Sequence, residues 1–172
     1  MANVARRRLG LHQVWLLVSP GNPLKPARGM APLATRLGSA RAIADGRRIL
    51  ATAIEAALGT RYTIDTLRDL RRRFPRVRFV WLMGADNLVQ FPRWRSWLEI
   101  AALMPFAVLP RPSYNPRALA GQAAQTLCHA RRPARTGKIL PLQPPPAWAF
   151  LPGRQNPMSA TAIRKLSAGD LP

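Results

Sequence analysis

Several kinds of side chain are scarce in this chain of 172 residues, and each scarcity excludes a kind of chemistry. The single cysteine, Cys128, cannot form a disulfide within the chain. Only two histidines, His12 and His129, accompany it, and the three are not spaced like the ligands of a zinc site. We therefore predict neither a metal-binding site nor thiol catalysis.

Long apolar runs are also absent. No run is long enough to cross a bilayer, and no charged segment followed by an apolar one marks a signal peptide. The sequence therefore predicts a soluble, cytoplasmic protein with no membrane partner. The length fits one domain, and a hydrophobic fraction of 48% is enough for a sizeable core. No pattern in the sequence indicates an oligomeric state.

Acidic residues are few: seven, against 27 lysines and arginines, for a formal net charge of +20. Such an excess is typical of proteins that bind nucleic acid through phosphate contacts. However, arginine outnumbers lysine by 24 to 3, and alanine and proline, which share GC-rich codons with arginine, are abundant. The arginines are scattered except at 6–8 and 71–73. A coding bias explains the charge at least as well, and anionic nucleotide substrates are the commoner use of such a field.

What the chain does contain is a series of short apolar runs that alternate with helical patterns. The runs are 14–18, 49–54, 79–83, 106–109 and 148–151, and the helices are expected at 2–9, 33–43, 64–74 and 97–103, with Thr63 as an N-cap. This alternation predicts an α/β fold with a parallel sheet. The run at 79–83 has the composition of a strand buried on both faces, so we expect it in the middle of the sheet. Residues 113–146 are expected to form surface helix and loop.

Polar residues follow the run at 79–83 directly. Gly84 ends it, and Asp86 is the next polar side chain. In open α/β sheets, ligands bind beyond the carboxyl ends of strands, where a glycine lets the backbone approach the ligand and a carboxylate can accept hydrogen bonds from ribose. Alternatively, Gly84 only turns the chain and Asp86 caps the next helix. The sequence leaves both interpretations open.

A second candidate site begins the last predicted helix. Ser159 can cap this helix, and Thr161 and Arg164 lie in its first turn. Free backbone N–H groups, two hydroxyls and a guanidinium at a helix N-terminus can bind phosphate. An ordinary capped helix is the alternative. Lys25 is a lone cation beyond the end of the run at 14–18, and the chain contains neither a Walker-type loop nor a G-x-G-x-x-G motif.

Four stretches of the chain, in this order, resemble the nicotinate mononucleotide adenylyltransferase family of the nucleotidyltransferase superfamily. They are SPGNPLK at 19–25, YT with TL at 62–67, MGADNL with FPRW at 83–94, and MSATAIR at 158–164. The resemblance covers nearly the whole chain. It implies a single Rossmann-like, doubly wound α/β domain over residues 1–172. It also implies AMP transfer from ATP to nicotinate mononucleotide, which gives nicotinate adenine dinucleotide and pyrophosphate in NAD biosynthesis.

The same resemblance implies roles for particular residues. Those implied to bind ATP are Lys25, Gly84, Asp86, Ser159, Thr161 and Arg164, with Gly84 and Asp86 against ribose and the others on phosphates. Trp94 is implied to stack on the pyridine ring, and core packing is the alternative. Backbone N–H groups near Thr63 and Arg95 are implied to receive the nicotinate carboxylate. Mg²⁺ is implied to accompany the pyrophosphate, and no enzyme nucleophile is needed.

One motif of the family is absent from this chain. Members open with a strand, a glycine-rich loop and an H-x-G-H motif whose histidines bind ATP phosphates, whereas Met1 already falls inside the expected first helix. No catalytic residue can therefore be named. We expect a domain without the innermost strand of its sheet, poorly folded and inactive as written, and a missing segment encoded upstream of Met1. Alternatives are a transferase for another phosphate ester, such as phosphopantetheine or nicotinamide mononucleotide, and a basic nucleic-acid-binding protein.

Overall fold

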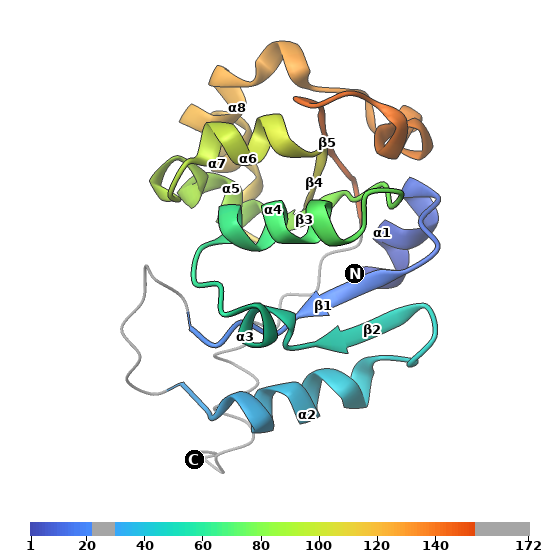
Figure 1. Cartoon of the computed structure of the whole chain (residues 1–172). Coiled ribbons are helices and arrows are strands. Elements are labelled where there is room, and N and C mark those ends of the chain that lie inside the picture. Colours follow the sequence, from blue (N-terminus) through green and yellow to red (C-terminus); the bar gives the residue numbers. More distant parts are fainter. Residues whose placement is uncertain (22–29, 154–172) are drawn as a thin grey trace, which may run out of the picture.

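The computed structural model describes residues 1–21 and 30–153, in which short parallel strands alternate with helices (Figure 1). The strands are β1 (Val14–Leu17), β2 (Ile49–Thr52), β3 (Trp81–Gly84), β4 (Phe106–Leu109) and β5 (Trp148–Phe150). The predicted α/β class is confirmed, and each predicted apolar run overlaps a strand, although β3 begins two residues later than expected. The second run is shorter than expected, because Ile54 already starts a helix.

The strands form two parallel sheets within the described residues. β1 pairs with β2, and the second sheet has the order β3-β4-β5. β3 is therefore an edge strand there, and the prediction that it lies in the middle of a sheet is wrong for this part of the chain. Trp81 and Leu82 are only half-buried as a result.

The helices are α1 (Ala2–Leu9), α2 (Leu33–Ile43), α3 (Ile54–Leu58), α4 (Thr63–Arg73), α5 (Ala85–Gln90), α6 (Trp97–Leu103), α7 (Asn115–Leu119) and α8 (Gln122–Thr126), with 3-10 segments η1 (Phe91–Arg93), η2 (Cys128–Ala130) and η3 (Ala134–Leu142). α1 ends as predicted at Gly10, whose φ of 65° is left-handed. The predicted N-cap at Thr63 is wrong by one residue, because Tyr62 occupies that position. None of the helices in the described ranges is both long and apolar enough to cross a membrane.

The largest part of the core surrounds β3, β4 and β5. The rings of Phe106 and Trp148 stack at 5.7 Å with an interplanar angle of 4°, and Trp148 is fully buried. Ala123, Leu127 and Leu140, all from the stretch 113–146, are buried as well. The prediction of a purely surface segment there is therefore wrong, because its small and branched apolar residues complete the core.

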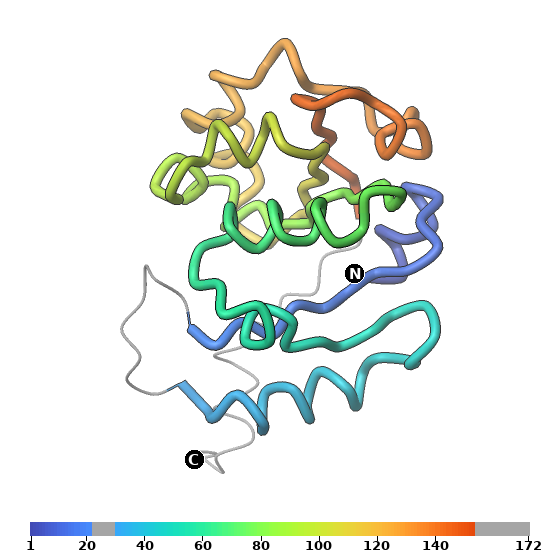
Figure 2. Tube along the Cα trace, viewed as in Figure 1, coloured from blue at the N-terminus to red at the C-terminus, as the bar shows by residue number. Residues whose placement is uncertain are grey.

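The sheet formed by β1 and β2 is less well covered. Figures 1 and 2 show it in one half of the molecule together with α2 and α3, whereas β3 to β5 and most other helices occupy the other half. α2 has no buried residue, and Ile43 is 76% exposed. The helix is present as predicted, but the described residues bury its apolar face only in part.

Asp45 holds the turn that leads into β2. Its Oδ1 accepts hydrogen bonds from the backbone N–H groups of Arg47, Arg48 and Ile49 at 3.0, 2.6 and 2.8 Å. These bonds hold the pKa of Asp45 below its usual value of 3.8, and the bond from Ile49 has the largest effect. The ionised carboxylate therefore stabilises the folded turn.

Asp45→Ala is expected to lower the Tm at pH 7. A lowered folded-state pKa gives stability that is present above the ordinary carboxyl pKa and is lost as the pH falls through the lowered value. The difference from wild type should therefore shrink below about pH 4. Circular dichroism melts between pH 3 and 8 measure it, with Asp45→Asn, which keeps one acceptor oxygen, as control. A difference that does not change with pH would contradict a role for the charge.

Candidate active site

Gly84, Asp86 and Arg111 meet beyond the carboxyl ends of β3 and β4. Gly84 ends β3 and is the N-cap residue of α5, whose first turn contains Asp86. A Cβ atom on Gly84 would clash with Oδ1 of Asp86 and lie 3.0 Å from Nε of Arg111. The predicted pair is therefore in close contact, and only glycine leaves room for it.

The side chain of Asp86 is 36% exposed, with one carboxylate oxygen turned inward. No side chain caps α5, so the structure does not support the alternative that Asp86 is a capping residue. Its Oδ1 is buried without a hydrogen-bond partner among the described residues, and Nε of Arg111 lies 3.5 Å away. At that distance the contact between the two side chains is an ion pair rather than a hydrogen bond. Because Oδ1 is enclosed, a hydroxyl donor can reach only the exposed part of this carboxylate.

Arg111 was not singled out in the sequence. Its backbone N–H donates to Oδ1 of Asn115 at 2.8 Å, which fixes the turn after β4. Its position just beyond a predicted buried strand could have marked Arg111 as a site residue, because the carboxyl ends of neighbouring parallel strands meet at one edge of a sheet. Nothing in the sequence showed that β4 is the neighbour of β3.

The structure brings the start of α4, at Thr63, close to the loop before α6 that contains Arg95. Cζ of Arg95 lies 4.7 Å from the ring centroid of Tyr62, the residue before Thr63. Arg61 lies over the same ring at 5.9 Å. Two guanidinium groups therefore flank the start of α4, where the first backbone N–H groups of a helix lack partners within the helix. Such a corner suits a carboxylate.

Trp94 has one ring edge against the core. Its ring meets that of Phe91 nearly perpendicularly, with centroids 5.5 Å apart, and the residue is half-buried. Packing thus accounts for part of the ring, while the rest is open to a ligand. Ser96, two residues later, has a φ of 51°, which is uncommon for a residue other than glycine. The backbone therefore turns sharply just after Arg95.

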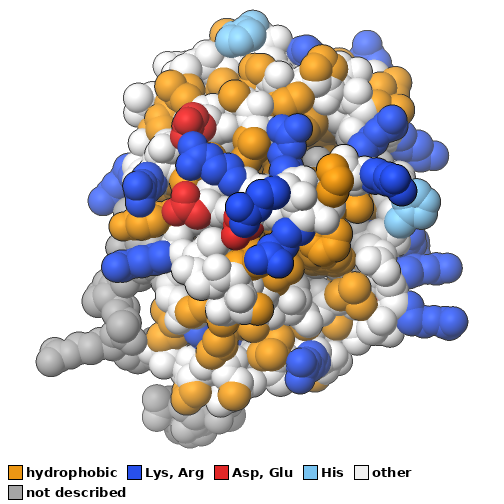
Figure 3. Space-filling model, in the orientation of Figure 1, with side chains coloured by type: hydrophobic (Ala, Val, Ile, Leu, Met, Phe, Trp, Pro, Cys, Tyr) orange, Lys and Arg blue, Asp and Glu red, His pale blue; other side chains and the backbone are white. Residues whose placement is uncertain are grey.

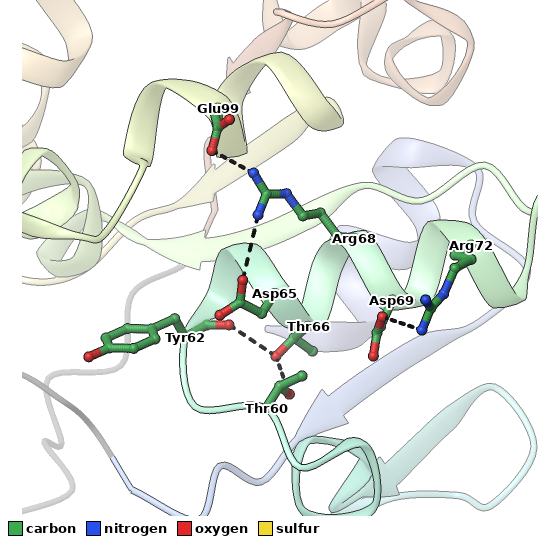
Figure 4. A network of polar contacts seen from close by, with 8 residues as sticks. All are labelled: Thr60, Tyr62, Asp65, Thr66, Arg68, Asp69, Arg72 and Glu99. Carbon is green, nitrogen blue, oxygen red and sulfur yellow. Dashed lines mark hydrogen bonds and ion pairs between the residues drawn. The ribbon is translucent and has the colours of Figure 1, made fainter.

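Figure 4 shows the polar contacts that hold the start of α4. The hydroxyls of Thr60 and Thr66 are 2.8 Å apart, and Thr66 also donates to the carbonyl of Tyr62 at 3.3 Å. Arg68 pairs with Glu99 at 2.9 Å, which links α4 to α6. Because that ion pair is exposed, it contributes at most about 1 kcal/mol. Its effect is to orient the two loops that precede these helices.

The remaining predicted site residues, Lys25, Ser159, Thr161 and Arg164, lie outside the described residues, and their roles stay predictions. In the ranges 1–21 and 30–153, no group of three histidine, cysteine, aspartate or glutamate side chains could hold a metal ion.

Comparison with known proteins establishes the family. Residues 1–166 match the cytidylyltransferase-like family. The chain is 59% identical over 164 residues to the probable nicotinate-nucleotide adenylyltransferase of Gluconacetobacter diazotrophicus, which is 95% of this chain and 76% of that protein. The probable nicotinate-nucleotide adenylyltransferase of Gluconobacter oxydans is 56% identical over 165 residues, 96% of this chain and 85% of that protein. The chain belongs to the nicotinate-nucleotide adenylyltransferase family.

The family inferred from four short motifs is thereby confirmed, and with it the assignment as a nucleotidyltransferase enzyme. Plasmodium falciparum nicotinic acid mononucleotide adenylyltransferase, solved in complex with APC, is similar with a TM-score of 0.52 and 11% identity, over 93% of this chain and 69% of that chain. At that identity the likeness concerns the fold alone. It supports the predicted Rossmann-like α/β fold.

One face of this adenylyltransferase family member shows how its charged side chains are distributed. On the face in Figure 3, lysine and arginine side chains are distributed over most of the area, with the acidic side chains among them. A nucleic-acid groove calls for a basic stripe instead. The distribution favours a general positive field that attracts anionic nucleotides.

Proposed function

We propose that this protein transfers the adenylyl group of ATP to nicotinate mononucleotide. The observation that carries the proposal is the approach of Arg95 to Tyr62, which joins the two loops expected to receive the nicotinate carboxylate. It is supported by identities of 45–59% over most of the chain to proteins named probable nicotinate-nucleotide adenylyltransferase. Residues 1–172 would act as one nucleotidyltransferase domain. The cytoplasmic location stays a prediction.

The reaction is an in-line displacement at phosphorus. A phosphate oxygen of nicotinate mononucleotide forms a bond to the α-phosphorus of ATP, the bond from that phosphorus to the bridging oxygen breaks, and pyrophosphate leaves. The protein contributes positioning and electrostatic stabilisation of the phosphoryl oxygens. Mg²⁺, bound by the phosphates, would neutralise charge on the departing pyrophosphate.

Gly84 and Asp86 are proposed to hold the adenosine ribose. The missing side chain at Gly84 leaves room for the carboxylate of Asp86, whose exposed part accepts a bond from a ribose hydroxyl. Arg111, 3.5 Å from Oδ1 of this carboxylate, keeps it oriented. Lys25, Ser159, Thr161 and Arg164 are proposed to contact the ATP phosphates.

The choice of nicotinate over nicotinamide is proposed to come from charge at the start of α4. Arg61 and Arg95 lie over Tyr62 and place two guanidinium groups beside the N–H groups near Thr63. A carboxylate gains from this field, whereas the neutral amide of nicotinamide does not. Calorimetric titration with both mononucleotides tests the choice, and equal or tighter binding of the nicotinamide form would contradict it.

Trp94→Ala is expected to weaken binding of nicotinate mononucleotide about 10- to 100-fold and leave ATP binding unchanged. Stacking of a heterocycle on an aromatic side chain contributes about 1–3 kcal/mol, which corresponds to this range. Isothermal titration with each ligand measures it, alongside the rate of pyrophosphate release. Trp94→Phe keeps a ring and should lose much less. A lowered Tm with unchanged affinity would mean that Trp94 only packs on Phe91.

A further inference from the structure

Among residues 1–21 and 30–153, Thr66 of α4 is the one polar residue that is fully buried. The other buried residues of this helix are Ile64, Leu67 and Leu70, which are all apolar. A hydroxyl in such surroundings costs free energy unless it is hydrogen-bonded, and valine, which has nearly the same shape, avoids that cost. The hydroxyl of Thr66 is therefore explained by what it binds and not by packing.

This hydroxyl both donates and accepts a hydrogen bond (Figure 4). Its proton goes to the carbonyl oxygen of Tyr62, at 3.3 Å. The hydroxyl of Thr60 lies 2.8 Å from Oγ1 of Thr66, and it is the donor there because the single proton of Thr66 is already used. A bond from threonine to the carbonyl four residues back is ordinary in a helix. The bond from Thr60 is not part of the helix and needs another explanation.

The bond between Thr60 and Thr66 closes a ring over residues 60–66. Thr60 is also fixed to α3, because its backbone N–H donates to the carbonyl of Glu55 at 3.0 Å. The connection from α3 to α4 is therefore anchored to both helices. The backbone of Arg61 and Tyr62 lies between the two anchor points, so the bond restricts where these two residues can lie.

The ring of Tyr62 contacts two guanidinium groups. Cζ of Arg95 lies 4.7 Å from its centroid, and Cζ of Arg61 lies 5.9 Å from it. Both arginines are exposed, and the attraction of a cation to an aromatic face is weak at exposed sites. The positions of the two cations therefore depend on a ring that is itself held in place.

Other contacts between α4 and α6 do not involve Thr66. Arg68 pairs with Glu99 at 2.9 Å, and Nη1 of Arg71 donates to the carbonyl of Leu103 at 2.7 Å. Both arginines follow Thr66 in the chain, farther along α4. These contacts should keep the two helices together when the hydroxyl of Thr66 is removed. Its loss should therefore act mainly on the connection that contains Tyr62.

We propose that Thr66 positions the groups that select the substrate. Through Thr60, its hydroxyl fixes the ring of Tyr62, and the ring holds two guanidinium groups where the carboxylate of nicotinate mononucleotide binds. Thr66 is fully buried and touches no substrate itself. This inference rests on the proposed function, in which charge at the start of α4 distinguishes nicotinate from nicotinamide. It adds the residue on which the arrangement of that charge depends.

Thr66→Val and Thr66→Ser form a matched pair, because valine keeps the volume without the hydroxyl and serine keeps the hydroxyl without the buried methyl group. Calorimetric titration of the 172-residue protein with nicotinate and nicotinamide mononucleotides measures the preference. In Thr66→Val, affinity for the nicotinate form should fall about tenfold and affinity for the nicotinamide form much less, because only the carboxylate depends on the two cations. Thr66→Ser should keep the preference, although its Tm falls.

Thr60→Val removes the same bond from its other end. It should reduce the preference by the same factor as Thr66→Val, and the double variant should lose no more than either single one, because both act through one contact. Thr136→Val is the control. The hydroxyl of Thr136 donates to the carbonyl of Pro133 at 2.8 Å in η3, and its loss should leave both affinities unchanged.

A measurement without ligand shows whether Arg95 moves. Protons over the face of an aromatic ring resonate upfield, so Tyr62 should shift the side-chain Nε–H signal of Arg95 in the wild-type protein. Magnetic resonance of protein labelled in its arginine nitrogens detects this signal, Arg95→Lys assigns it, and Tyr62→Leu gives its position without the ring. The signal should move toward that reference in Thr66→Val and stay in place in Thr66→Ser.

The proposal is overturned if Thr66→Val keeps the wild-type preference or leaves the Arg95 signal in place, or if Thr66→Ser loses the preference as fully as Thr66→Val. A wild-type protein without any preference would instead contradict the proposed function. The Arg95 signal would then decide by itself whether Thr66 positions the guanidinium group. If Thr66→Val does not fold, Thr60→Val replaces it in both measurements, because Thr60 is only half-buried.

Discussion

Gly84→Ala should weaken ATP binding about 100-fold and lower kcat/KM for ATP by a similar factor. The backbone at Gly84 has a φ of −80°, which alanine adopts without strain, so the effect must come from the added methyl group. That group would clash with Oδ1 of Asp86 and press on Arg111. Displacing the carboxylate from the ribose would remove a hydrogen bond to a charged group, worth about 1.5–3 kcal/mol, and 100-fold corresponds to about 2.7 kcal/mol.

Gly38→Ala is the matched control. Gly38 lies inside α2 with nothing within 4 Å of the position of an added Cβ atom. Alanine there should stabilise the helix by about 0.5–1 kcal/mol and leave ATP binding unchanged. Titration calorimetry and thermal melts on both variants separate site effects from fold effects. Normal ATP affinity in Gly84→Ala would show that the ribose does not lie against this glycine.

Trp148→Ala is expected to reduce the free energy of unfolding by about 4 kcal/mol. Large aromatic residues in cores lose about 3–5 kcal/mol on truncation to alanine. Trp148 is fully buried, stacks on Phe106, and donates from Nε1 to the carbonyl of Leu127 at 2.7 Å. The substitution removes the stack, opens a cavity and leaves that carbonyl without its donor. Urea unfolding followed by circular dichroism measures the loss.

Trp148→Phe tests how much of this loss comes from the indole hydrogen bond, and Leu98→Ala is the surface control. Trp148→Phe keeps a ring beside Phe106 but loses the indole N–H, so it should cost about 1–3 kcal/mol. Leu98→Ala, at a position that is 52% exposed, should stay within about 0.5 kcal/mol of wild type. If Trp148→Ala cost less than Leu98→Ala, the central place of Trp148 in the core would be disproved.

The sequence alone was sufficient for features that depend on neighbouring residues. Largely apolar runs of four to six residues marked the strands, because a strand buried on both faces needs mostly apolar side chains. The stop of α1 at Gly10 followed from the left-handed conformation that glycine accepts. The family could be inferred from motifs whose residues are close together in the sequence, such as the stretch from Met83 to Trp94.

Other features depended on residues far apart in the chain. The approach of Arg111 to Asp86 needs the pairing of β3 with β4, and that of Arg95 to Tyr62 needs α4 to pack on α6. Local patterns contain no information about which strand or helix becomes the neighbour. The same limit applied to the stretch 113–146, whose apolar residues became core only because β4 and β5 lie beneath them.

The apolar run at 79–83 shows which features the local sequence determines and which depend on contacts with distant segments. Its composition determined that Trp81 to Gly84 form a parallel strand, because β-branched and aromatic side chains suit one. Whether both edges of that strand are paired is decided by hydrogen bonds to other segments. β4 pairs with one edge, and among the described residues no strand pairs with the other. A residue's own side chain has little influence on that outcome, since pairing joins backbone groups that every residue but proline possesses.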